Sequence, residues 1–262
     1  MVATGCVTAS GEVPYTATSE GCDQVGDFQD VSDFVQSGYS NPELSVVCDA
    51  NTVYVSSNGI PNFDYVQVTP NSLSTQNYVW TLPRYPQMAG STTDVPLGGA
   101  AAIAVNGLPI FGPTEAPDHG YRDPYLDDIL DYCNGHTAPR GDYHFHAPPE
   151  CIFDDYEGNP TLVVGYAFDG YPIMAPFVCD DDGCTSVTEV QSSYRLIEST
   201  YGETIENAWD AHEYVPGLGD LDECNGTETS DGGYAYFATE TFPYFMGCYV
   251  GEVDEGNMAG GR

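Results

Sequence analysis

Three of the chain's five histidines, His136, His144 and His146, lie within a stretch of eleven residues. His144 and His146 are two positions apart, so on a β-strand both imidazoles would face the same side. A third imidazole from His136 would complete a three-nitrogen face of the kind that binds Zn²⁺ or Cu²⁺. His119 is a candidate for a fourth ligand or for a contact that supports the ligands. The alternative is that these histidines form hydrogen bonds within a polar, aromatic-rich core.

Bound metal alone would not make this chain an enzyme. A catalytic zinc keeps an open coordination position and has a base nearby. Asp131, Asp142 and Glu150 are close in sequence, but their spacing matches no known catalytic motif. The chain also lacks a Gly-x-Ser-x-Gly elbow, a His-Glu-x-x-His pair and a phosphate-binding loop. The sequence therefore favours a non-catalytic protein, with a metal-dependent hydrolase or oxidase as the alternative.

Two acidic segments are candidates for calcium binding, because clustered carboxylates beside a turn suit a hard cation. Their candidate ligands are Asp180, Asp181, Asp182, Asp220, Asp222 and Glu223. Neither segment has EF-hand spacing, so solvated acidic loops are the alternative. Asn225 begins the only Asn-x-Thr/Ser triplet of the chain whose middle residue is not proline, and it is the predicted glycosylation site.

The element that must position the histidines occurs twice. A Cys-Asn-Gly frame appears at about residues 126–151, here called the first unit, and again at about 218–251, the second unit. When the two are aligned, the three histidines correspond to Thr227, Ala235 and Phe237. The frame repeats and the histidines do not. This predicts a scaffold used twice, with transition-metal chemistry in the first unit only.

Nine cysteines are too many for a reduced cytosolic chain of this length, so an oxidising, extracellular compartment is expected. The repeat predicts equivalent disulfides Cys133–Cys151 and Cys224–Cys248, and Cys179–Cys184 would close a short acidic loop. Cys6, Cys22 and Cys48 remain. Because this number is odd, one of them is free or pairs with another copy of the chain.

Short apolar runs broken by Gly, Pro and Asn follow residue 46. They predict a mainly β fold, with a sandwich or barrel-like body of short strands and a few short helices. Helices are expected around residues 124–132 and near 204–212. Asn-Gly or Asp-Gly pairs at Asn58, Asn106 and Asp169 predict tight turns. Residues 1–32 are interpreted as an N-terminal arm, and 33–262 as one β domain.

Charge is the most unusual feature of the composition. Forty acidic residues face five arginines and no lysine, which gives a formal net charge of −35 at pH 7. Such a chain repels phosphates and anionic lipids, so nucleic acid and membrane surfaces are excluded as partners. No apolar run reaches the roughly 18 residues of a membrane span. Its self-repulsion indicates either adaptation to salt or bound divalent cations.

The combined motifs resemble those of the YHYH-domain family. They are Asn-Gly-His, Tyr143-His144-Phe145-His146, Gly-Tyr-Ala-Phe-Asp-Gly-Tyr-Pro-Ile and Leu-Asp-Glu-Cys-Asn-Gly, spread between Val46 and Gly251. Phe145 departs from the family's name-giving tetrapeptide, which has Tyr there, and the histidines are kept. The resemblance implies a secreted domain and gives little indication of activity.

The expected function is that of an extracellular structural or binding protein that self-assembles with bound metal ions. The polar arm could add a strand to the sheet edge of a neighbouring copy, which would build an oligomer or a filament. Alternatively, the arm folds back on its own domain. The competing function is a secreted metal-dependent enzyme that uses His136, His144 and His146.

Overall fold

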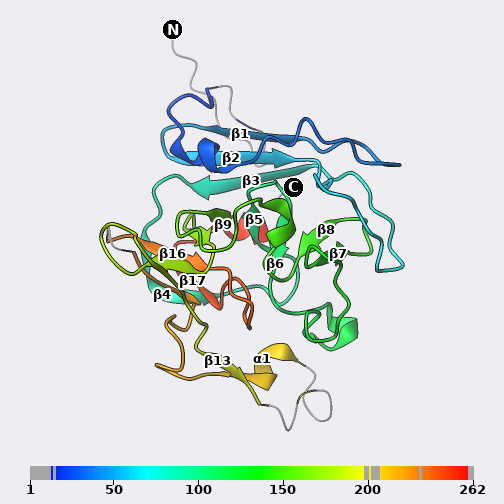
Figure 1. Ribbon diagram of the computed structural model, residues 1–262. Coiled ribbons are helices and arrows are strands. Elements are labelled where there is room, and N and C mark those ends of the chain that lie inside the picture. Colours follow the sequence, from blue (N-terminus) through cyan, green and yellow to red (C-terminus); the bar gives the residue numbers. More distant parts are fainter. Residues whose placement is uncertain (1–12, 14–15, 198–200, 202–206, 230–231, 259–262) are drawn as a thin grey trace.

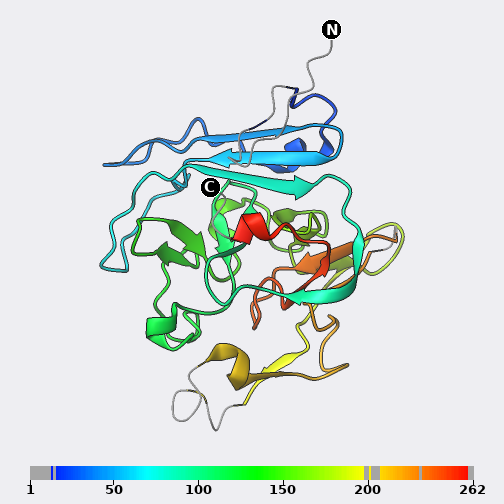
Figure 2. The same cartoon turned by 180° about the vertical axis from the view of Figure 1, so that it is seen from behind.

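The computed structural model describes the chain except for residues 1–12, 14–15, 198–200, 202–206, 230–231 and 259–262. It confirms a mainly β fold of short strands (Figures 1 and 2). Among the described residues the strands form five sheets, and none of them closes into a barrel.

The body is built on an eight-stranded sheet. Its strands, in spatial order, are β15 (Gly226–Glu228), β16 (Tyr234–Phe237), β10 (Pro172–Met174), β9 (Val163–Ala167), β5 (Ala100–Ala104), β6 (Pro109–Phe111), β8 (Tyr143–Phe145) and β7 (Gly135–Thr137). The two halves have the same connectivity about the antiparallel β5–β9 pair. In each half a hairpin (β5–β6 or β9–β10) is followed by a strand parallel to its second member (β8 or β16), and that strand pairs with the outermost one.

The central strands are covered on both faces. All five residues of β5 are buried, and Gly165 of β9 passes so close to the Ile103 carbonyl that a Cβ would collide with it. Both central hairpins close on the expected turns, because Gly107 and Gly170 have φ of 80° and 89°. Such positive angles favour glycine.

A three-stranded sheet lies along one side of the body (Figure 1): β1 (Leu44–Cys48), β2 (Thr52–Ser57) and β3 (Tyr78–Pro83). Burial alternates along β3, where Tyr78, Trp80 and Leu82 face inward and share one hydrophobic core with the large sheet. Three two-stranded sheets complete the strands: β4 (Met88–Asp94) with β17 (Cys248–Gly251), β11 (Phe177–Cys179) with β12 (Val187–Glu189), and β13 (Tyr194–Leu196) with β14 (His212–Tyr214).

Helices are few and short. They are the 3₁₀ helices η1 (Asp23–Asp27), η2 (Pro117–His119) and η3 (Glu150–Ile152), and the α-helices α1 (Ala208–Ala211) and α2 (Glu255–Met258). The helix expected at 124–132 is wrong, because this segment forms consecutive turns. Asp123 caps the first turn by accepting from Tyr125 and Leu126, and Asp128 then adopts φ = 54°, which ends any helix. The helix expected near 204–212 is present only as α1, and residues 204–206 lie outside the described part. No described helix is long and apolar enough to cross a membrane.

All three predicted disulfides are present: Cys133–Cys151, Cys179–Cys184 and Cys224–Cys248. Cys22 and Cys48 are buried thiols. Cys6 falls outside the described residues.

The described part of the N-terminal arm packs on its own chain. Thr18 pairs with Cys48 at the end of β1, η1 follows, and the Gln29 amide donates to the Val105 carbonyl of the central hairpin. Most of residues 1–15 lies outside the described part. Pairing of those residues with another copy therefore stays a prediction.

Candidate metal centre

The fold brings the three predicted histidines of the first unit together. His136 on β7 pairs directly with His144 on β8, and His146 follows that strand. One nitrogen from each ring lies within 4.8 Å of the others, and the side chains are almost completely buried. This group can hold a metal ion.

Backbone carbonyls fix the orientation of the three rings. The Nδ1 atoms of His136, His144 and His146 lie 3.4, 3.2 and 2.8 Å from the carbonyl oxygens of Ile129, Asp142 and Gly112. A carbonyl only accepts, so the two shorter contacts assign the proton to Nδ1 in His144 and His146. Their two Nε2 atoms then present lone pairs to the centre of the group, which is the form in which imidazole binds metals.

The Nε2 atoms of His144 and His146 are only 2.9 Å apart. With both Nδ1 atoms protonated, two lone pairs meet there, and the contact is repulsive unless a positive species lies between them. A proton is disfavoured, because burial and the neighbouring imidazoles lower the pKa of both rings well below its ordinary value. Two nitrogens held about 2.0–2.1 Å from one tetrahedral zinc ion lie roughly 3.3 Å apart, so a metal would satisfy this pair once the rings separate by a few tenths of an ångström.

A carboxylate that the sequence did not single out joins the three rings. Glu115, in the loop after β6, places Oε1 2.9 Å from Nε2 of His136 and 3.8 Å from Nε2 of His146. Oε1 is buried, and its contact with His136 favours the charged form of the carboxylate. Burial alone would raise the pKa of this carboxyl, but the adjacent histidines outweigh burial and lower the pKa to about 2. Glu115 therefore adds a negative oxygen to the centre.

A cavity of about 500 Å³ reaches the centre from the surface. All three histidines and Glu115 line it, and Phe111, Ile129 and Pro139 contribute apolar wall. His119 also lines this cavity, but it is exposed and lies outside the converging group. The site is therefore shielded from bulk water and still accessible to a small molecule.

The Cys-Asn-Gly frame holds this arrangement in place. The Asp131 carboxylate accepts from the amides of Cys133 and Gly135 and from the Tyr143 hydroxyl. Asn134 takes φ = 60°, and its carbonyl accepts from the amide of His146. A Cβ at Gly135 would collide with the Tyr143 hydroxyl, so only glycine fits. From the neighbouring strand β6, the Phe111 ring stacks on the ring of His144, with 3.8 Å between the two centroids.

A family model described as YHYH protein matches residues 79–251. The chain belongs to the YHYH family. Comparisons with curated proteins and with solved structures find no match. The name-giving segment of this YHYH protein alternates as predicted: His144 and His146 face the cavity, while Tyr143 and Phe145 pack against Phe63 in the core. Phe145, which stands where the family's tetrapeptide has Tyr, therefore faces the core and does not contact the three histidines' cavity.

The second unit of this YHYH protein forms the same hydrogen bonds. Asp222 accepts from the amides of Cys224 and Gly226 and from the Tyr234 hydroxyl, with distances of 2.9, 3.2 and 3.0 Å. Asn225 takes φ = 63°, and its carbonyl accepts from the amide of Phe237. The Asp-Cys-Asn-Gly frame is thus a structural device.

The positions that correspond to the metal centre carry no ligand groups in the second unit. Thr227, Ala235 and Phe237 line a separate cavity of about 930 Å³. Val178 lines it too. It occupies the place of Glu115, because Phe-Gly-Pro-Thr-Glu after β6 matches Met-Ala-Pro-Phe-Val after β10. The alignment pairs the acidic Glu115 with the apolar Val178, and this difference was the signal in the sequence by which Glu115 could have been found.

The acidic residues proposed for calcium lie elsewhere. Asp180, Asp181 and Asp182 are exposed in the loop closed by Cys179–Cys184. The Asp222 carboxylate already accepts a hydrogen bond from the amide of Cys224 in the frame. Asp220, two residues earlier, accepts from the Gln191 amide. Within the described part of the chain, the three histidines are the only group of three or more His, Cys, Asp or Glu side chains that could share a metal.

Four other candidate residues also lie apart from the centre. Glu150 is exposed at the start of η3, and the buried Asp142 contributes only its backbone carbonyl to the ring of His144. Asn225 is fully buried, and its side-chain amide donates to the carbonyl of Phe237. The folded chain therefore holds the predicted glycosylation nitrogen away from solvent. Glu223 lies in the turn beside Asp222, and its carbonyl accepts from Tyr194.

Proposed function

We propose that this YHYH protein is an exported metalloprotein that binds one zinc or copper ion through His136, His144 and His146, and that the ion is the catalytic centre of a hydrolase or oxidase type of enzyme. The observation that carries the proposal is the 2.9 Å approach of the His144 and His146 Nε2 atoms, both of which are acceptors. A shared cation is the simplest way to stabilise that contact.

The ligand set selects the class of metal. Three imidazole nitrogens with one carboxylate suit Zn²⁺ or Cu²⁺, whereas Ca²⁺ and Mg²⁺ prefer sites made of oxygen atoms. Because burial keeps His144 and His146 neutral, they need to lose no proton before they bind. The acidic Glu115 also offsets part of the charge of a divalent ion.

Access to the ion supports a catalytic role over a purely structural one. Structural zinc sites are closed, whereas catalytic sites keep a position open for water or substrate. Here the cavity of about 500 Å³ leads directly to the Nε2 atoms. A bound metal would polarise an oxygen atom of a ligand in this cavity. Glu115, beside His136, is placed to accept a hydrogen bond from that ligand.

Export is supported by two features of the chain. Three disulfides persist only in an oxidising compartment, and a surface with a net charge of −35 suits a salt-rich surrounding.

Self-association is a second candidate function, and the free edge of β1 favours it. Within the described residues this strand pairs with β2 and, at Cys48, with Thr18 only, so the edge at Leu44–Val47 can accept another strand. Negative-stain images of native material, with and without residues 1–15, test this idea. Uniform single particles in both samples would reject it.

Metal content tests the main proposal. Protein purified without chelator, then stripped and reloaded with Zn²⁺ or Cu²⁺, is expected to carry one ion per chain by elemental analysis. The His144→Ala/His146→Ala variant should carry none, while Thr227→Ala/Phe237→Ala, the matched change in the second unit, should still carry one. Full metal content in the histidine variant would reject the site.

The open position has its own test. In the Cu²⁺-loaded protein, added azide should change the electron paramagnetic resonance spectrum, because a small anion can enter the cavity and coordinate. A spectrum that does not respond to azide would indicate a closed, structural centre. In that case metal binding would stand and the catalytic role would not.

A further inference from the structure

Two buried thiols lie side by side at the base of the N-terminal arm. Cys48 ends β1, and Cys22 directly precedes η1; both belong to the main hydrophobic core, with 3% and 7% of their surface exposed. The thiol of Cys22 is in hydrogen-bond contact with Cys48. The two residues are 26 positions apart in the sequence, so their contact is made by the fold.

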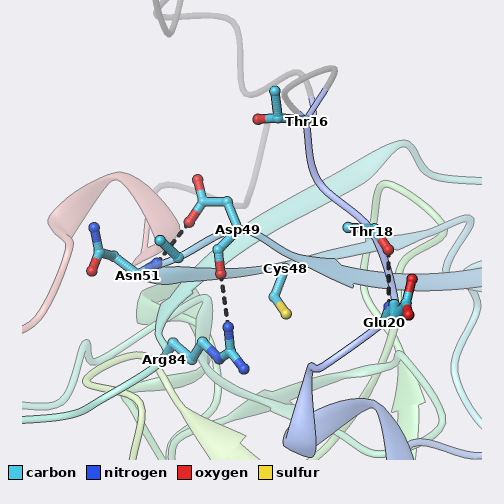
Figure 3. A pocket seen from close by; sticks show the side chains of 8 residues that line it. Thr16, Thr18, Glu20, Cys48, Asp49, Asn51 and Arg84 are labelled. Atoms are coloured by element: carbon cyan, nitrogen blue, oxygen red, sulfur yellow. Dashed lines mark hydrogen bonds between the residues drawn. The ribbon is translucent and has the colours of Figure 1, made fainter.

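The backbone on both sides of this pair is fixed. Thr18 and Cys48 exchange two backbone hydrogen bonds, of 3.0 and 2.9 Å. The guanidinium of Arg84 donates to the carbonyl of Gly21, next to Cys22, and to the carbonyl of Asp49, next to Cys48. Figure 3 shows Arg84 reaching Asp49 beside the Cys48 side chain. One cation therefore holds both cysteine-bearing segments together.

Cys48 can also be reached from outside. It lines a cavity of about 460 Å³ together with Thr16, Glu20 and Asn51 (Figure 3). Its side chain is otherwise covered, so a reagent must enter through this cavity. A small disulfide molecule is of a suitable size.

We propose that Cys22 and Cys48 form a fourth disulfide, which is made by exchange with a low-molecular-weight disulfide, RSSR. The Cys48 thiolate attacks one sulfur of RSSR and releases RS⁻, giving a mixed disulfide at Cys48. Cys22 then loses its proton and attacks the Cys48 sulfur, which releases the second RS⁻. The two thiols are oxidised by two electrons in total, and RSSR is reduced to two RSH.

The order of the two steps follows from the surroundings. Burial and the contact with Cys48 raise the pKa of Cys22 to about 12, so Cys22 stays protonated while Cys48, which faces the cavity, reacts first. The finished bond fastens the segment from Thr18 to η1 onto the edge of β1. It also accounts for eight of the nine cysteines and leaves Cys6 as the one free thiol.

Thiol counting and fragment mapping of native protein, prepared without reductant, test the proposal. Alkylation in denaturant should label one thiol per chain, at Cys6. Trypsin is unsuitable for mapping because residues 1–84 contain no internal cleavage site and include Cys6, Cys22 and Cys48. Cleavage after glutamate places these cysteines on separate fragments, 1–12, 21–43 and 44–115. Fragments 21–43 and 44–115 should be linked and should separate on reduction.

Matched variants give the proposal a second readout. Cys48→Ser should raise the number of alkylated thiols from one to two, while Cys6→Ser should lower it from one to none. Three alkylated thiols in the native chain, or a link from fragment 1–12 to either of the others, would overturn the proposal. Because mapping is performed on the native chain, this outcome does not depend on whether a variant folds.

Discussion

The first and second units share one frame and differ in what that frame presents to a cavity. In each, an aspartate accepts from a cysteine amide, a glycine amide and a tyrosine hydroxyl, and an asparagine takes a positive φ. The four cavity-facing positions are different in every case. They are His136, His144, His146 and Glu115 in the first unit, and Thr227, Ala235, Phe237 and Val178 in the second.

The comparison separates residues that hold the fold from residues that we propose bind a metal. The frame residues are determined by geometry: a Cβ on Gly135 or Gly226 would meet the hydroxyl of the tyrosine that crosses it. The side chains of the four cavity-facing positions take no part in those hydrogen bonds, so they can change without loss of the fold. Metal binding is thus expected to depend on four side chains that a common scaffold carries.

Transplanting the ligands into the second unit is the strongest test of this view. Val178→Glu, Thr227→His, Ala235→His and Phe237→His together should raise the metal content from one ion per chain to two. The carbonyls that would orient the new rings, those of Ala175, Asp220 and Gly233, correspond to Gly112, Ile129 and Asp142. We expect an affinity within roughly 100-fold of the native site, the range over which surrounding contacts tune metal sites.

The control for the transplant carries the same four changes on a His144→Ala/His146→Ala background. It should bind one ion, held by the second unit alone. A variant that is folded by circular dichroism and binds no ion there would break the equivalence of the two frames.

Removal of either frame disulfide gives the next largest effect. Replacing Cys133 and Cys151 with serine, or Cys224 and Cys248, should lower the free energy of unfolding by about 3 kcal/mol in each case, because the two closed loops are similar in length. Only the first change should also weaken metal binding, since Asn134, next to Cys133, holds the amide of His146. Denaturant titration and metal titration of both variants measure the two effects. Equal loss of metal affinity in both would contradict the separation of frame and site.

The frame aspartates allow a finer comparison. Asp131→Asn and Asp222→Asn should each cost about 2 kcal/mol, because each carboxylate accepts three hydrogen bonds. Asp131 is the more buried of the two, so its substitution should cost more. Urea unfolding of both variants gives the order. A cost near zero at either position would show that the carboxylate is not required there.

Much of the fold could be predicted from local pattern and repetition. The two long disulfides followed from aligned cysteines, and the turns of the two central hairpins followed from the pairs at Asn106 and Asp169. The turn predicted at Asn58 is wrong, because the chain continues without a turn after β2. The helix expected at 124–132 failed because the sequence alone does not reveal that Asp123 caps a single turn and that Asp128 then takes a positive φ. The order of the eight-stranded sheet depends on contacts between distant segments, for which no local pattern exists.

The candidate site was predictable only where its ligands are close in sequence. His144 and His146 followed from strand alternation, and His136 from its nearness along the chain. Glu115 lies 21 positions before His136 and reaches the centre because β6 runs parallel to β8. His119 is nearer in sequence, but η2 leaves it exposed at the cavity wall. Proximity along the chain thus favoured His119 as the additional group beside the rings, whereas the residue of this loop that lies there is Glu115.

Glu115→Gln tests the smallest part of the difference between the units. The substitution keeps the size of the side chain and removes its negative charge, so metal affinity should fall by about 10-fold while the free energy of unfolding changes little. The histidines hold the pKa of Glu115 at about 2, so the wild-type carboxylate stays charged in mildly acidic solution, and the difference in affinity should persist at pH 5. Competition titrations with a chromophoric chelator at pH 7 and pH 5 measure it. Val178→Gln, the matched change in the second unit, should leave the metal affinity unchanged. If it lowered the metal affinity as much as Glu115→Gln does, the charge next to the rings would not be what distinguishes the two cavities.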